Sequence, residues 1–78
     1  MQNLLDSKRI GANLKRIRIA HGETQQQLGE IIGYGATTIS NYENGYRLPD
    51  LETFVKIALH YQAELKDFLE CNEEEHTQ

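Results

Sequence analysis

A short helix with a sharp start and a sharp stop is the feature that most limits how this chain can fold. Residues 24–27, TQQQ, have the form of a capping box, in which the Thr24 hydroxyl bonds the Gln27 amide and the Gln27 side chain bonds the Thr24 amide. Gly33 can adopt the left-handed conformation that ends such a helix in a tight turn. Three apolar residues between these limits share one helix face: Leu28, Ile31 and Ile32.

The next segment is bounded by Gly35 and Gly45, and it predicts a second short helix with an unusual outer surface. Ile39 and Tyr42 lie three residues apart and are expected to face inward. The opposite side of the helical wheel carries only small hydrogen-bonding groups: Thr37, Ser40, Asn41 and Asn44. A helix that meets only solvent usually carries Lys and Glu there, because these are better helix formers. This composition indicates close contact with another polar surface.

Three further helices are predicted around this pair. The first spans about residues 7–21 and ends before Gly22; its apolar face is formed by Ile10, Leu14 and Ile17. The fourth begins after the turn and N-cap at Pro49-Asp50; its apolar stripe is Leu51, Phe54, Val55, Ala58 and Tyr61. A short fifth piece carries Leu65, Phe68 and Leu69. No segment shows the alternation of a strand, so the expected fold class is all-α, with five short helices.

The size of the chain allows one hydrophobic core. With 78 residues, of which 38% are apolar, we expect one domain over residues 7–70. Residues 71–78 are acidic and have no apolar periodicity, so we expect a disordered tail. No apolar run reaches the length of a signal-peptide core or a membrane span, and neither is expected.

No metal, cofactor or catalytic activity is expected. The three histidines have no metal-like spacing: His21, His60 and His76. The single Cys71 cannot close an internal disulfide, which indicates a reducing, cytoplasmic compartment. Asp50 and Glu52 suit a helix cap and a first-turn acid rather than a catalytic pair. A domain this small seldom buries a substrate, so a binding module is favoured over an enzyme.

Charge is distributed unevenly along the chain, although the net charge is −4. Residues 1–22 carry five basic side chains and one acidic one, whereas residues 50–78 carry eight acidic and two basic side chains. Four of the basic residues fall opposite the apolar face of the first helix: Lys8, Arg9, Lys15 and Arg16. That face is expected to point to solvent or to a polyanion.

Residues 10–69 closely resemble the Cro and phage-repressor type of helix-turn-helix regulators, without insertions. The family pattern of the first helix is matched by Ile10, Gly11, Leu14 and Arg18. The second helix opens with Thr24-Gln25 and continues with Leu28-Gly29, and the third matches at Ile39, Ser40, Tyr42 and Glu43-Asn44-Gly45. The resemblance implies a lambda repressor-like fold in which the second and third helices form the helix-turn-helix and the third enters the major groove.

The resemblance also implies roles for single residues. Gln25 is expected to grip the sugar-phosphate backbone and to brace the recognition helix. Base contacts are expected from Ala36, Thr37 and Asn41; Thr38 and Ser40 suit phosphate or water-bridged contacts, and Asn44 and Arg47 suit phosphate contacts. Arg18 and Glu43 are expected to form a structural ion pair between the first and third helices.

The function implied is that of a sequence-specific double-stranded DNA-binding regulator, acting as a repressor on a two-fold-related operator. A homodimer is expected, because one short recognition helix reads only a few base pairs. Its self-contact is expected at Leu65, Phe68, Leu69 and the end of the chain.

Some residues depart from the family pattern and leave alternatives open. Gly29 stands where Ala is usual and Gly35 where a Ser or Thr cap is usual, which predicts a softer motif. Gln62 replaces a common Gly after the fourth helix. Ile19 and Leu59 fall at positions that are usually polar, which favours a protein partner. The same fold could therefore serve a protein-interaction module, or an antitoxin whose acidic tail contacts a basic partner: Glu70, Glu73, Glu74 and Glu75.

Overall fold

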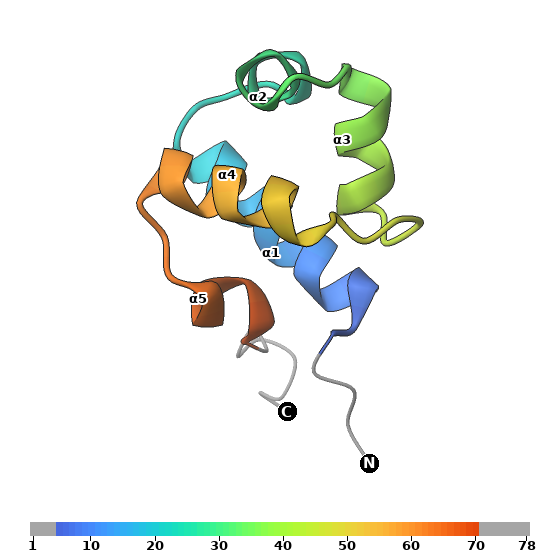
Figure 1. Cartoon of the computed structure of the whole chain (residues 1–78), viewed down its shortest axis with the longest axis vertical. Coiled ribbons are helices and arrows are strands. Elements are labelled where there is room, and N and C mark those ends of the chain that lie inside the picture. Colours follow the sequence, from blue (N-terminus) through green and yellow to red (C-terminus); the bar gives the residue numbers. More distant parts are fainter. Residues whose placement is uncertain (1–4, 71–78) are drawn as a thin grey trace.

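The computed structural model describes residues 5–70, which form five α-helices and no strand. The helices are α1 (Ser7–Ala20), α2 (Gln25–Ile32), α3 (Ala36–Glu43), α4 (Leu51–Tyr61) and α5 (Leu65–Leu69). In Figure 1, α4 crosses in front of α1, α2 and α3 lie at one end of the molecule, and α5 lies toward the other end. The expected all-α, five-helix fold is confirmed. The expected tail at 71–78 lies outside the described residues.

Side-chain caps set the starts of three helices. Asp6 accepts from the backbone amides of Lys8 and Arg9 at 3.0 and 3.3 Å. Both halves of the predicted capping box are present, with Gln27 N to Thr24 Oγ1 at 3.0 Å and Thr24 N to Gln27 Oε1 at 2.8 Å. Asp50 caps α4 by accepting from the Thr53 amide at 2.9 Å. These local hydrogen bonds satisfy backbone amides that have no acceptor within the helix. They involve residues close in sequence, so they can be predicted from the sequence.

The core joins all five helices, but two of the predicted apolar stripes were partly wrong. Its buried members are Leu14, Ile17, Leu28, Ile32, Ile39, Tyr42, Ile57, Tyr61 and Phe68. On α2, Ile31 is 49% exposed. On α4, the buried residues are Thr53, Ile57 and Tyr61, whereas Leu51 and Val55 face outward. The number of apolar residues does not show which of two apolar stripes on one helix is buried. In α4, the packing against the other helices determines which stripe enters the core.

Asn13 fixes the end of α5 against α1. Its buried Nδ2 donates to the carbonyls of Phe68 at 2.8 Å and Glu70 at 2.9 Å, and its Oδ1 accepts from Arg16 Nη2 at 3.0 Å. No buried side-chain nitrogen or oxygen within the described range lacks a partner. Because all the polar groups of the Asn13 amide are hydrogen-bonded, its desolvation is compensated. The amide therefore fixes the position of α5 on α1.

Glu23 ties the α1–α2 turn to the end of α4. Its carboxylate accepts from Tyr61 Oη at 2.7 Å and pairs with His60 Nε2 at 2.6 Å, and its backbone carbonyl accepts from Arg18 Nη1 at 2.6 Å. Burial opposes ionisation of this carboxyl, but the hydrogen bonds from Tyr61 and His60 outweigh it and lower the pKa of Glu23. The ionised form therefore stabilises the fold.

We expect Glu23→Gln to lower the free energy of unfolding by about 1 kcal/mol at pH 7, because it removes a charge-assisted hydrogen bond. The contribution is complete above the unfolded pKa of about 4.3 and is lost as the pH falls through the lowered folded pKa. Urea unfolding at pH 7, 5 and 3 measures it. The exposed Glu30→Gln is the control, with an expected change below about 0.5 kcal/mol. A difference that stays the same at pH 3 would contradict this role.

Gly11 marks the closest approach of α1 to α3. A Cβ at this position would collide with the backbone carbonyl oxygen of Tyr42 and would lie 2.7 Å from that of Glu43. These are backbone atoms of the neighbouring helix, so they cannot rotate away as a flexible side chain would.

Gly11→Ala is accordingly expected to destabilise the domain by about 1–3 kcal/mol, even though Ala is the better helix former by about 1 kcal/mol. Thermal and urea unfolding check the sign. Gly35→Ser is the matched control, because nothing lies within 4 Å of the added Cβ and a serine can cap α3. An increase in the free energy of unfolding for Gly11→Ala would contradict this, because it would show that α1 and α3 can move apart without loss of stability.

Candidate nucleic-acid interface

The α2–α3 turn is held tightly by glycines. Gly33 closes α2 with a φ of 88°, and the Tyr34 amide donates to the Gly29 carbonyl at 2.7 Å. A Cβ on Gly29 would collide with the Tyr34 carbonyl oxygen. The absence of a side chain at Gly29 thus leaves room for the turn. The helix propensity lost at this glycine is the cost of a close backbone contact with Tyr34.

The outer face of α3 presents the predicted small polar groups. Thr37 and Asn44 are exposed, and Ser40 and Asn41 are half-buried. Asn44 Nδ2 donates to Ser40 Oγ at 3.2 Å. Ile39 and Tyr42 are buried on the opposite side, as predicted. The flanking positions are taken by Ala36 and Thr38, both half-buried.

The loop after α3 is fixed to the helix by the carbonyls of Tyr42, which accepts from the Gly45 amide at 3.1 Å, and of Asn41. Asn41 O accepts from the amides of Tyr46 at 2.9 Å and Arg47 at 3.2 Å. The Arg47 side chain is exposed and follows directly on the polar face. The loop therefore places the backbone of Arg47 beside the end of α3, with the charged side chain exposed.

Lys8 is a second cation at this edge, and its place was missed from the sequence. Gly45, with a φ of 80°, packs on the start of α1, and a Cβ there would lie 2.8 Å from Lys8 Cγ. Lys8 thus sits beside the α3–α4 loop. Its role depends on the α1–α3 crossing, which periodicity along α1 alone does not show.

Two other basic residues of α1 form hydrogen bonds or ion pairs within the domain. Arg16 bonds Asn13 and lines a hollow that also contains Asp67 and Glu70 of the α5 region. Arg18 is buried in an ion pair with Glu43. Of the four residues expected on the basic face of α1, Arg16 is therefore engaged within the domain, whereas Arg18 was predicted for the ion pair and not for that face.

The Glu43 carboxylate joins three helices. Its Oε2 accepts from Arg18 Nε at 2.6 Å, and its Oε1 accepts from Arg18 Nη2 at 3.0 Å and from Gln25 Nε2 at 3.1 Å. The bidentate hydrogen bond raises the pKa of Arg18 against the opposing effect of burial. Gln25 thus ties the start of α2 to the end of α3 through its amide nitrogen.

The described part of the chain has neither a cluster of metal-ligating side chains nor a helix that could span a membrane. Residues 5–70 contain no group of three or more His, Cys, Asp or Glu that could hold a metal ion. His21 Nδ1 contacts the Ile17 carbonyl at 2.9 Å, and His60 pairs with Glu23. Within the same range, no helix is long and apolar enough to cross a membrane.

The fold and the polar α3 face define a helix-turn-helix domain of the kind found in DNA-binding transcription regulators. Residues 14–68 match the family model described as helix-turn-helix, and the chain belongs to this family, in its Cro and phage-repressor type.

The chain is similar to two curated proteins, from Bacillus subtilis and a Bacillus phage, and to a solved controller protein. The HTH-type transcriptional regulator ImmR of Bacillus subtilis (strain 168) is 39% identical over 49 residues, which is 63% of this chain and 39% of ImmR. The ImmF control region 10 kDa protein of Bacillus phage phi105 is 34% identical over 56 residues, which is 72% of this chain and 62% of that protein. The chain therefore spans less than two thirds of either relative. The crystal structure of the restriction-modification controller protein C.AhdI from Aeromonas hydrophila aligns with a TM-score of 0.74 and 25% identity, over 81% of this chain and 96% of that one.

Removing one partner of the Arg18–Glu43 pair is expected to be costly. Arg18→Leu should lower the free energy of unfolding by about 3–5 kcal/mol, because it leaves a buried carboxylate uncompensated. The double variant Arg18→Leu/Glu43→Leu should be more stable than Arg18→Leu alone. Denaturant unfolding of Arg18→Leu, Glu43→Leu and the double variant gives the coupling energy between the two side chains. Additive losses would show that the two charges do not interact.

Proposed function

We propose that this chain is a sequence-specific double-stranded DNA-binding transcription regulator that acts as a repressor and reads the major groove with α3. The observation that carries the proposal is that the outer face of α3 holds small hydrogen-bond donors and acceptors, with Lys8 and Arg47 beside the loop that follows. A solvated helix has no need of such a face. The relatives named as a transcriptional regulator and as a control-region protein support the same reading. We further propose a cytoplasmic location, and no catalysis or cofactor.

Base choice is assigned to three residues of α3. The Asn41 amide can bond an adenine edge with both its groups, and Ala36 and the Thr37 methyl can pack on a thymine methyl. Each good contact of this kind supplies about 1–3 kcal/mol of discrimination against a wrong base. Thr37 is exposed and Asn41 half-buried on the same face, so both reach one surface.

Phosphate contacts are assigned to the borders of that face. They come from Gln25, Thr38, Ser40, Asn44 and Arg47, and we add Lys8. Only two of these carry a positive charge. We therefore expect a shallow dependence of affinity on salt, since each neutralised phosphate contributes a slope of about −0.9 in a log–log plot.

The first experiment is selection from a random duplex pool by the purified chain at near-physiological salt. We expect a motif with two-fold symmetry and half-sites about one helical turn apart, as a homodimer requires. A folded chain that enriches no motif would favour the protein-interaction reading, for which exposed Ile19 and Leu59 are the specific observation.

Two variants separate base reading from phosphate binding. Asn41→Ala should weaken binding to the selected site by about 1–3 kcal/mol and relax the choice of base at one position in each half-site. Arg47→Ala should weaken binding to all sequences alike and reduce the salt slope by about 1. Titrations of selected and scrambled duplexes over a range of salt measure both effects. Lys66→Ala on α5 is the charge control and should change neither. Equal losses on both duplexes for Asn41→Ala would remove it from base reading.

A further inference from the structure

Asn41 carries a side-chain amide whose donor and acceptor are both available on the outer face of α3. The other amide of this face, Asn44, donates to Ser40 Oγ at 3.2 Å, whereas within residues 5–70 the Asn41 amide has no hydrogen-bond partner. Asn41 is half-buried, and the exposed Thr37 lies one turn before it on the same side of the helix. An amide in this position can offer its nitrogen and its oxygen together to a ligand that meets α3.

The backbone that carries this amide is fixed on both sides. The Asn41 carbonyl accepts from the amides of Tyr46 at 2.9 Å and Arg47 at 3.2 Å, so the following loop folds back on the last turn of α3. Two residues after Asn41, the Glu43 carboxylate is hydrogen-bonded to side chains of α1 and α2. A side chain on such a fixed backbone has little freedom to move away from a ligand that carries an additional group. Its contact is therefore expected to depend on the exact shape of the ligand.

The adenine edge assigned to Asn41 can be changed by one methyl group. In duplex DNA this edge offers N7 as an acceptor and one N6 hydrogen as a donor, because the other N6 hydrogen pairs with thymine. A methyl group on N6 keeps that base pair and replaces the hydrogen in the major groove, next to N7. The Asn41 oxygen then has no donor to accept from, and the methyl group obstructs the hydrogen bond from Nδ2 to N7. Both hydrogen bonds of the pair are lost together.

We propose that this chain distinguishes adenine from N6-methyladenine, and that methylation of the adenine that meets Asn41 blocks its binding to DNA. This inference rests on the DNA-reading function proposed above and concerns the regulation of the same site. The ligand is then double-stranded DNA that is unmethylated at one adenine of each half-site. An enzyme that methylates adenine N6 would control occupancy of the operator without any change in the regulator itself.

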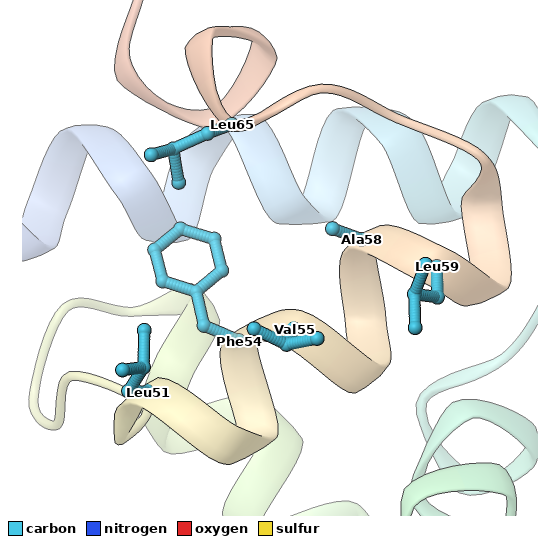
Figure 2. Close-up of a pocket in the computed structure, with 6 residues that line it drawn as sticks. All are labelled: Leu51, Phe54, Val55, Ala58, Leu59 and Leu65. Atoms are coloured by element: carbon cyan, nitrogen blue, oxygen red, sulfur yellow. The ribbon is translucent and has the colours of Figure 1, made fainter.

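The surface around Asn41 is separate from the exposed apolar side of α4. Figure 2 shows the hollow beside α4 and α5, which is lined by apolar residues that are not assigned to DNA: Leu51, Phe54, Val55, Ala58, Leu59 and Leu65. The self-contact expected from the sequence is corrected at Phe68, which is 1% exposed and belongs to the core. A substitution at Asn41 therefore leaves the apolar side of α4 unchanged, and its effect on DNA binding can be assigned to α3.

The test uses the duplex obtained by selection from the random pool, with each of its adenines replaced in turn by N6-methyladenine. We expect one adenine in each half-site at which the methyl group raises the dissociation constant by about 10-fold or more, because two hydrogen bonds are lost. Replacement of the same adenine by 7-deazaadenine removes the N7 acceptor without adding bulk, and it should weaken binding to a smaller extent. Fluorescence anisotropy titrations with the purified chain measure each dissociation constant.

Two asparagine variants assign the effect to one side chain. Asn41→Ala should bind the methylated and unmethylated duplexes with dissociation constants that agree within about 2-fold, because the amide that the methyl group obstructs is absent. Asn44→Ala is the matched control, since it removes the neighbouring amide that donates to Ser40. It should weaken binding to both duplexes alike and keep the difference between them. Circular dichroism confirms that each variant is folded.

The outcomes separate this inference from the proposed function. A loss on methylation that persists in Asn41→Ala would overturn the inference, as would a selected motif in which every adenine tolerates the methyl group. In both cases the motif itself leaves the proposed DNA-reading function in place. A folded chain that enriches no motif would remove the proposed function and this inference together.

Discussion

The buried Glu43 carboxylate is the group on which the arrangement of α1, α2 and α3 depends. It sits at the end of α3 and accepts hydrogen bonds from Arg18 of α1 and Gln25 of α2, at 2.6 to 3.1 Å. A buried charge pair adds little net stability, because desolvation offsets the attraction, but few alternative packings satisfy both partners. The pair therefore selects one orientation of α3 relative to α1 and α2. The direction in which Asn41 and Thr37 point follows from that orientation.

Close backbone contacts at two glycines also restrict how the helices pack against one another. Gly11 lets α1 approach the carbonyls of Tyr42 and Glu43, and Gly29 lets α2 approach the carbonyl of Tyr34. Both glycines give up helix propensity in exchange for a short distance between elements. Glu23 adds a third constraint, because it joins the start of the helix-turn-helix to Tyr61 and His60 of α4. The polar face of α3 is thus held by polar and steric constraints as well as by the apolar core.

Local features of the fold were predictable from the sequence, whereas features that depend on helix crossings were not. The capping box at Thr24 and the cap at Asp50 involve residues three apart, so their chemistry is visible in the sequence itself. The Arg18–Glu43 pair followed from family resemblance and was confirmed. The place of Lys8 beside Gly45, and the choice of Ile57 over Leu51 for the core, depend on how helices distant in sequence pack together. The roles assigned to the DNA-facing residues remain predictions.

Helix α4 carries apolar residues on two faces, one buried in the core and one exposed. A domain of this size has a small core, and exposed aliphatic residues beyond it add no stability while they meet water. Covering the exposed Leu51, Val55 and Leu59 with a binding partner would convert that area into stability that rises with the concentration of the partner. Ile57 and Tyr61 on the other face of α4 pack in the same core as Ile39 and Tyr42 of α3, so the position of α4 and the orientation of the polar α3 face depend on each other.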